Sequence, residues 1–102
     1  MENPVSQIQV KTDQIKRLLE GAIPNGVAYA VGKWRDWIKY EVVRDANKSF
    51  LCVSDDFFAY LDEAEISKRF EREGAARAMQ NSPNGRFILT RDGLQSRSCE
   101  EI

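Results

Sequence analysis

The chain has 102 residues, of which 42% are hydrophobic and 30% charged, a balance typical of one ordinary folded domain and not of a disordered tail. Its 15 basic and 16 acidic residues leave a net charge of −1, which removes the general electrostatic attraction on which most nucleic-acid binders depend. No apolar run approaches the roughly 20 residues that cross a bilayer, and the first residues lack the pattern of a signal peptide. We therefore expect a cytoplasmic protein that makes no membrane contact.

The first predicted element is a helix. Apolar residues recur at spacings near 3.5, which would give one amphipathic helix from Pro4 to Glu20. The competing interpretation is a short strand at residues 8–10, followed by a helix that Thr12 or Asp13 caps and that continues to Glu20. We expect a helix at least from Asp13 to Glu20. In either case Gly21 is expected to end the helix in the left-handed conformation, and the chain turns at residues 24–26.

Three strand patterns follow this turn. Residues 27–31 are apolar throughout and β-branched at both ends, and Gly32 is expected to close the strand. Residues 38–42 alternate between apolar and polar side chains, which is typical of a strand with one buried face. A turn at residues 45–48 leads into the apolar run Phe50–Val53. We expect the three strands to form an antiparallel meander.

A helical layer follows the meander and leads to a last strand. Ser54 is the expected N-cap of a first helix, and Asp62, with a glutamate three residues later, predicts that a second helix begins there; one long helix is the alternative. Gly74 interrupts the second helix and indicates close packing against another element. Strong turn residues at 82–85 then precede a buried strand at residues 87–89.

These elements predict an α+β fold. We expect one domain over residues 1–102, with an about four-stranded, largely antiparallel sheet and helices packed on one of its faces. Asp92 and Gly93 turn the chain once more. Residues Gln95–Ile102 lack periodicity and are expected to form a frayed tail.

The chain contains no histidine, which is the commonest general base near neutral pH and the commonest metal ligand. The remaining candidates are carboxylates, at Asp55 and Asp56 and from Asp62 to Glu65, but acidic residues are expected at helix starts for electrostatic reasons alone. No glycine-rich phosphate loop is present. We therefore expect no catalysis, no metal and no cofactor, and a small enzyme that uses carboxylates is the remote alternative.

The two cysteines are too far apart in sequence to form a redox motif. Cys52 lies in the apolar run between Phe50 and Val53, whose side chains leave no route for an electropositive partner. It is therefore expected to be buried, reduced and structural. Cys99 lies in the polar tail and is expected to be exposed.

One stretch has the composition of a binding surface. From Lys33 to Tyr40, aromatic side chains are interleaved with cations. Such interleaving suits single-stranded nucleic acid, because bases stack on aromatic rings while cations follow the phosphates. Exposed tryptophan and arginine equally anchor contacts between proteins. The candidate binding residues in this stretch are Lys33, Trp34, Arg35 and Lys39.

The two tryptophans are expected to differ in their environment. If Gly32 ends its strand, Lys33–Asp36 forms a surface connection that carries Trp34 and Arg35. Trp37 adjoins the alternating strand and is the better candidate for the core. In a rival interpretation, Trp34 folds back over the sheet edge as a lid on the core.

Residues Ser49–Leu94 resemble a family of small uncharacterised bacterial domains, known only as a domain of unknown function. The shared features are a cysteine-bearing strand that runs into a serine-capped helix, a phenylalanine-containing second helix and a closing Gly-Arg-Phe-Ile-Leu-Thr strand. The strand and its cap read Phe50-Leu51-Cys52-Val53-Ser54. The resemblance implies a fold and no activity.

The leading interpretation is a non-enzymatic module that binds another protein or a second copy of itself. Such a module would act as a small inhibitor or regulator from a bacterial or phage mobile element. The alternative is a nucleic-acid-binding domain that uses the basic and aromatic Lys33–Lys48 hairpin. A steep salt dependence of binding to oligonucleotides would distinguish the second function from the first.

Overall fold

The computed structural model describes the backbone of residues 4–98 and the side chains of residues 9–29, 31–33 and 35–98. The chain begins with helix α1, Pro4–Ala22, so the long helix is correct and no strand forms at residues 8–10. Gly21 does not end this helix, because the hydrogen bonding continues until the N–H of Ile23 donates to the Leu19 carbonyl at 3.0 Å. The left-handed residue is instead Asn25, with a φ of 62°, in the predicted turn.

Three antiparallel strands form the predicted meander. They are β1 (Val27–Trp34), β2 (Trp37–Arg44) and β3 (Asn47–Ser54). Two-residue turns join them, and the first residue of each turn has a positive φ, 53° at Arg35 and 56° at Asp45. Short hairpins favour this conformation because it matches the twist of the strands on either side.

Gly32 does not close β1, contrary to the prediction. The strand continues beyond it until Trp34 pairs with Trp37 of β2. Gly32 instead lies at a bulge where the register with β2 shifts, and its φ of 143° is one that glycine adopts readily. The predicted surface connection Lys33–Asp36 is therefore reduced to a two-residue turn.

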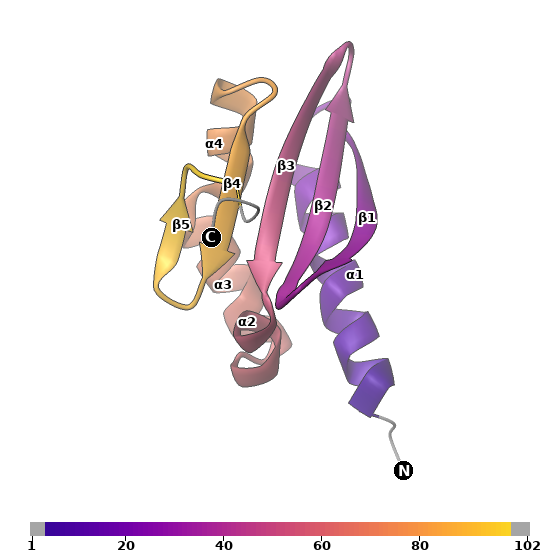
Figure 1. Ribbon diagram of the computed structural model, residues 1–102, viewed down its shortest axis with the longest axis vertical. Helices are drawn as coiled ribbons and strands as arrows, with labels where there is room; N and C mark the ends of the chain where they lie inside the picture. The colour runs from indigo at the N-terminus through magenta and orange to yellow at the C-terminus, as the bar shows by residue number, and fades with distance from the viewer. Residues whose placement is uncertain (1–3, 99–102) are drawn as a thin grey trace.

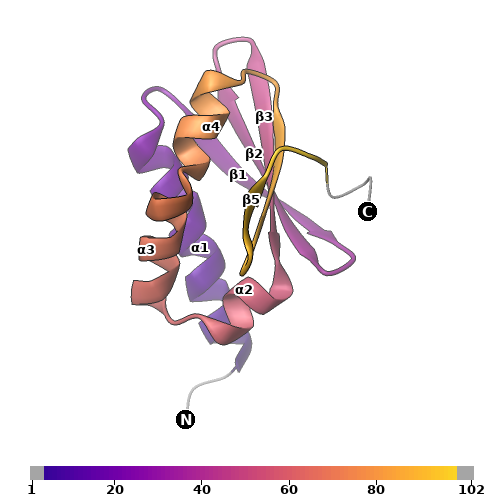
Figure 2. The same cartoon turned by 90° about the vertical axis from the view of Figure 1, so that its left-hand side faces the viewer.

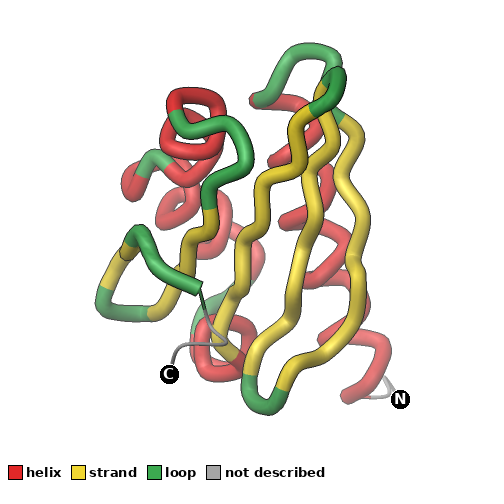
Figure 3. The backbone as a smooth tube through the Cα atoms, turned by 45° about the horizontal axis from the view of Figure 1, so that its top comes forward, coloured by secondary structure: helices red, strands yellow, loops and turns green. Residues whose placement is uncertain are grey.

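A crossover of three helices carries the chain from β3 to the next strand. The helices are α2 (Asp55–Tyr60), α3 (Glu63–Glu73) and α4 (Ala75–Asn81). β4 (Arg86–Thr90) then pairs with β3 in parallel, and β5 (Gly93–Gln95) is antiparallel to β4. The five strands lie side by side in chain order (Figures 1 and 3). The α+β class is confirmed, but the sheet has one more strand than predicted and is mixed, since the long crossover returns β4 in the direction of β3.

Two residues divide the helical layer into three helices. Asp62 caps α3 as predicted, because its Oδ1 accepts a hydrogen bond from the Glu65 N–H at 2.8 Å. Gly74 ends α3 with a φ of 68°, and its N–H donates to the Glu71 carbonyl at 3.1 Å. A Cβ at Gly74 would meet no atom within 4 Å, so the glycine serves the left-handed conformation and not the close packing that was predicted. Ser54 occupies the N-cap position of α2 without a capping side-chain hydrogen bond.

Helices α1, α3 and α4 lie on one side of the sheet, as predicted (Figure 2). Between the two layers lies the main core, whose largest fully buried members are Tyr40, Phe57, Ile15, Leu19, Leu51, Ile66, Leu89 and Val53. Tyr40 also links the layers by a hydrogen bond, since its hydroxyl donates to the Thr12 carbonyl of α1 at 2.8 Å. Burial, with a smaller contribution from the Asp13 carboxylate, raises the pKa of the Tyr40 phenol well above its usual range.

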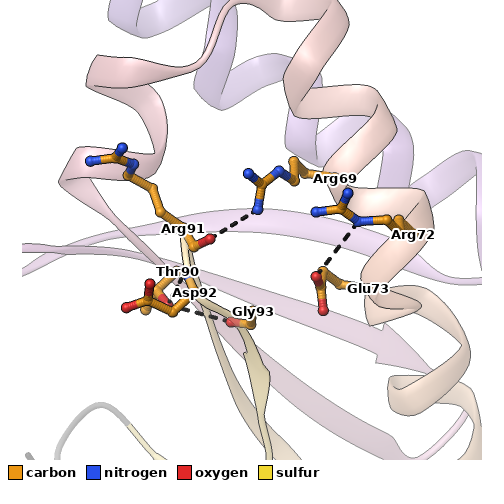
Figure 4. Close-up of polar contacts among 7 residues, drawn as sticks. All are labelled: Arg69, Arg72, Glu73, Thr90, Arg91, Asp92 and Gly93. Atoms are coloured by element: carbon orange, nitrogen blue, oxygen red, sulfur yellow. Dashed lines mark hydrogen bonds and ion pairs between the residues drawn. The ribbon is translucent and has the colours of Figure 1, made fainter.

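The hairpin of β4 and β5 is fastened to the helical layer. Figure 4 shows Arg69 of α3 reaching the hairpin turn, where its Nη1 donates to the Arg91 carbonyl at 2.9 Å. The Arg91 guanidinium lies 4.5 Å from the centre of the Tyr60 ring, at the end of α2. A Cβ at Gly93 would lie 3.3 Å from a carboxylate oxygen of Glu73, which leaves little room for a side chain there. This edge of the sheet is thus held against α2 and α3.

The loop before β4 is bound to the β2–β3 hairpin. Residues 82–85 form the predicted turn, in which Asn84 has a φ of 66°. The Asn84 side-chain oxygen accepts a hydrogen bond from the Lys48 N–H at 2.8 Å, and its amide donates to Asn47 Oδ1 at 3.0 Å. One side chain therefore joins two segments that are 36 residues apart.

The C-terminal tail is ordered further than predicted. β5 includes Gln95, and the side chain of Ser98 is buried. Cys99 and the rest of the predicted frayed tail lie outside the described residues. Within residues 4–98, no helix combines the length and the apolar character needed to cross a membrane.

Candidate functional site

The candidate site is the face of the sheet that points away from the helices, which we call the open face. Because side chains alternate along a strand, Leu51 and Val53 of β3 enter the core, whereas Phe50 and Cys52 point to the open face. None of the described helices covers that face (Figure 2). The strand register places four of its residues in one row across the sheet: Tyr29, Glu41, Phe50 and Arg86.

Phe50, the β3 member of this row, has one cation from each neighbouring strand close to its ring. The Nζ of Lys39 and the Cζ of Arg86 are each 4.9 Å from the centre of the Phe50 ring. A cation over the electron-rich face of a ring is stabilised by roughly 0.5–1 kcal/mol at an exposed site. The open face therefore presents two positive charges around one half-buried aromatic ring.

An ion pair neutralises the acidic member of the row. The Nζ of Lys48 lies 3.5 Å from Glu41 Oε1, on the neighbouring strand. Exposed pairs of this kind contribute at most about 1 kcal/mol to stability. With Glu41 paired, Lys39 and Arg86 give this part of the open face a positive character.

A second, smaller apolar cluster lies on the open face. Cys52 is only 3% exposed and packs with Ile88 of β4, and Trp37 is half-buried against them. The predicted burial of Cys52 is confirmed, although Lys39 lies directly opposite it on β2, so the strand neighbours do not exclude a cation. Trp37 packs against this second cluster and not against the main core, and the predicted difference from Trp34 is not tested because the Trp34 side chain lies outside the described residues.

The edge strand β1 carries the most exposed apolar surface of the sheet. Val27, Tyr29 and Val31 are 44, 51 and 54% exposed, and they alternate along one strand. Among the described side chains, the two other large hydrophobic residues with such exposure are Val10 and Tyr60, which lie on separate helices. β1 is also the first strand of the sheet, so its outer edge has no strand beside it in the described chain.

The four predicted binding residues are not brought to one place. Lys33 lies near the end of β1, and its Nζ is 3.1 Å from Asp55 Oδ2 at the start of α2. Arg35 is exposed in the adjoining turn. Trp34 has its backbone in β1, but its side chain lies outside the described residues, so neither the anchor nor the lid interpretation is tested. Lys39 lies farther along β2, over Phe50.

Several residues of the open face were missed by the sequence analysis, chiefly Phe50 and Arg86. The run Phe50–Val53 is apolar throughout, which favours a strand buried on both faces and conceals the alternation. Arg86 borders a turn and gains its place only through the parallel pairing of β4 with β3. Tyr29 carried a usable signal, because a large aromatic residue between small alanines marks one face of a strand.

The carboxylates that were considered for catalysis lie mainly at helix starts, where they were expected. Asp55 and Asp56 occupy the first turn of α2, and Asp62 caps α3. A groove of about 660 Å³ beside α2 is lined by four aspartates and one arginine, among other residues: Asp36, Asp55, Asp56, Asp92 and Arg97. Among the described residues, no group of three or more cysteine or acidic side chains could hold a metal ion.

Comparison with known proteins gives no relative for this chain. No family model matches it, and neither the curated proteins nor the solved structures yielded a significant match. The resemblance of residues 49–94 to a bacterial domain of unknown function therefore stays a prediction.

Proposed function

We propose that this protein is a non-enzymatic module that binds another protein through the open face and its edge strand β1. The proposal rests on the exposed side chains of Val27, Tyr29 and Val31, on a strand whose outer edge has no strand beside it in the described chain. Exposed strand edges pair with strands of other chains, and contiguous exposed apolar residues commonly mark contact surfaces. A role as a small inhibitor or regulator, encoded by a bacterial or phage mobile element, remains part of this proposal.

The surroundings of β1 fit a protein partner. Tyrosine and arginine are enriched among the residues that dominate the energy of protein interfaces, and Tyr29 and the exposed Arg35 lie on and beside this strand. Lys39, on the strand next to β1, and Arg86, farther across the sheet on β4, place positive charges on the same face and would favour acidic residues on the partner. Trp34, the last residue of β1, and Arg35, in the adjoining turn, stay within the proposed surface.

Affinity capture tests this function. Tagged wild-type protein and the variant Tyr29→Ser are incubated with extract of the source cell, and retained proteins are quantified by mass spectrometry. The amount of a true partner that is retained is expected to fall by about 30-fold or more with Tyr29→Ser. This is the effect of removing an interface residue that contributes about 2 kcal/mol to binding. Tyr60→Ser is the control, because Tyr60 is an exposed tyrosine as well but lies on α2. If both variants retain the same proteins as the wild type, the proposed surface is wrong.

A second candidate function is the binding of single-stranded nucleic acid by the open face. It is favoured by the aromatic ring of Phe50, held between Lys39 and Arg86, since bases stack on rings while cations contact phosphates. Lys39 and Lys48 belong to the hairpin that the sequence pointed to, whereas Arg86 is added by β4.

Fluorescence anisotropy with labelled oligonucleotides tests this second function. If it is correct, affinity falls steeply between low and physiological salt, and Lys39→Gln and Arg86→Gln each reduce the salt dependence by about one released counterion. Binding that is absent at low salt, or that is unchanged in both variants, would remove this candidate.

A further inference from the structure

We infer that the partner of β1 is a second copy of this chain, paired edge to edge through residues 27–31. The inference rests on the proposed function and names the partner for it. β1 is the outermost strand on its side of the sheet, so two copies that join there would form one continuous sheet with the helices of both copies on the same side.

The edge strand is self-complementary. Residues 27–31 read Val-Ala-Tyr-Ala-Val, which is the same sequence in both directions. An antiparallel pair centred on Tyr29 therefore places valine opposite valine, alanine opposite alanine and tyrosine opposite tyrosine, as a twofold axis requires. The stretch carries no charge, so no like charges face each other across the pair.

The backbone groups that such a pair needs point outward. The Ala28 N–H donates to the Glu20 carboxylate at 3.3 Å, which places this N–H on the outer side of β1. Because backbone groups alternate in direction along a strand, those of Ala30 point the same way. Ala28 of one copy and Ala30 of the other can thus exchange two hydrogen bonds, and symmetry repeats the exchange. The bond to Glu20 is long for a charged acceptor and is readily replaced.

Charges on α1 are complementary across the proposed axis. Glu20 reaches the edge strand, so it lies on the side of α1 that faces the edge, and Lys16, one turn earlier, shares that side. α1 runs opposite to β1 in the layer behind it (Figure 1). A twofold axis at Tyr29 therefore brings the Glu20 of each copy toward the Lys16 of the other. Two pairs of opposite charges favour this antiparallel arrangement.

The bulge at Gly32 sets the length of the contact. Because the register with β2 shifts between Ala30 and Gly32, the regular part of β1 ends at the bulge around Val31, and we expect the pair between copies to extend no farther than residues 27–31. A specific interface needs roughly 1,000 Å² of buried surface, and five residues from each copy approach this area only together with the facing sides of the two α1 helices. We therefore expect a dimer of about micromolar affinity, in equilibrium with the monomer.

Disulfide trapping tests the register of the β1 pair between the two copies. The cysteine variants are made in the full chain, which also carries Cys99→Ser. Tyr29→Cys is expected to form a covalent dimer on mild oxidation, because the two copies of residue 29 would face each other at a separation that a disulfide can span. Val31→Cys is the matched control, since Val31 is similarly exposed on the same strand but lies opposite Val27 of the other copy. Val31→Cys alone should not cross-link, whereas its mixture with Val27→Cys should.

Sedimentation equilibrium tests the dimer without added thiols. The wild type is expected to show a concentration-dependent dimer that Tyr29→Lys weakens by tenfold or more and Tyr60→Lys leaves unchanged.

A wild type that is monomeric throughout, or a Val31→Cys variant that cross-links as readily as Tyr29→Cys, would overturn the inference. If the protein is monomeric but still captures another protein through Tyr29, the inference fails and the proposed function stands. If neither self-association nor capture depends on Tyr29, both fail.

Discussion

The two faces of the sheet are built from the same strands but protect their side chains in different ways. On the face toward the helices, burial is collective, because a whole layer covers residues such as Leu51 and Val53. On the open face, burial is local: Cys52 is protected by Ile88 and Trp37, whereas Tyr29 at the edge stays exposed. On the open face, the exposed fraction of the apolar side chains therefore increases toward β1. A partner bound at β1 would bury these side chains.

The largest expected difference between the faces comes from neighbouring residues of β3. Leu51→Ala should lower the free energy of unfolding by about 2–5 kcal/mol, because it leaves a cavity in the covered core. Phe50→Ala removes more atoms but from a half-buried site, so we expect a smaller loss. Urea unfolding measures both changes. An equal loss for Phe50→Ala would show that the open face is as well packed as the covered face.

Cys52 offers the next largest effect and a test of local burial. Cys52→Ser should cost roughly 1–3 kcal/mol, because it places a hydroxyl among apolar neighbours. Cys52→Ala is the control for lost volume without added polarity. In the native protein with Cys99→Ser, a thiol reagent should label Cys52 slowly, and rapid labelling would contradict local burial.

Tyr40 allows the covered face to be examined through pH. Tyr40→Phe should cost about 0.5–1.5 kcal/mol at neutral pH, because the hydrogen bond to Thr12 is lost. The pKa of the phenol is higher in the folded protein than in the unfolded chain, so folding favours the neutral form. This stability is fully present below about pH 10 and is lost as pH rises above it, by up to about 1.4 kcal/mol per pH unit. Thermal unfolding between pH 8 and pH 11, roughly spanning the tyrosine pKa, should show a flatter decline in Tyr40→Phe than in the wild type.

The smallest expected effect concerns the cations of the open face. Lys39→Gln should lower stability by roughly 0.5 kcal/mol, because its ammonium no longer interacts with the Phe50 ring. A double-mutant cycle with Phe50→Leu isolates this interaction from other effects of either change. Additive effects in the cycle would mean that Lys39 is held near Phe50 without stabilising it.

Some local features of this fold could be predicted from the sequence because each depends on a few neighbouring residues. Asp62 is followed by a glutamate three residues later and caps α3, and residues 82–85 have the composition of a turn and form one. The alternation of residues 38–42 placed Tyr40 on the buried face correctly. In these cases the local preference and the overall fold agree.

The features that the sequence did not reveal depend on distant residues. The parallel pairing of β4 with β3 follows from how three helices pack, which no local pattern encodes. Gly32 has the composition of a strand end, but pairing with β2 extends the strand past it. The row containing Phe50 and Arg86 combines residues from several strands, so it exists only once the sheet has formed.

The Asn84 side chain, which links the loop before β4 to the β2–β3 hairpin, has a consequence for the order of folding. The hairpins of the meander join residues close in sequence and can form within about microseconds. The β3–β4 pair forms more slowly, because the segment between these strands must first be closed into a loop. Asn84 and its partners Asn47 and Lys48 meet at the end of this long closure. We expect the rate-limiting barrier to lie at this step, with the N-terminal half already structured when β4 arrives.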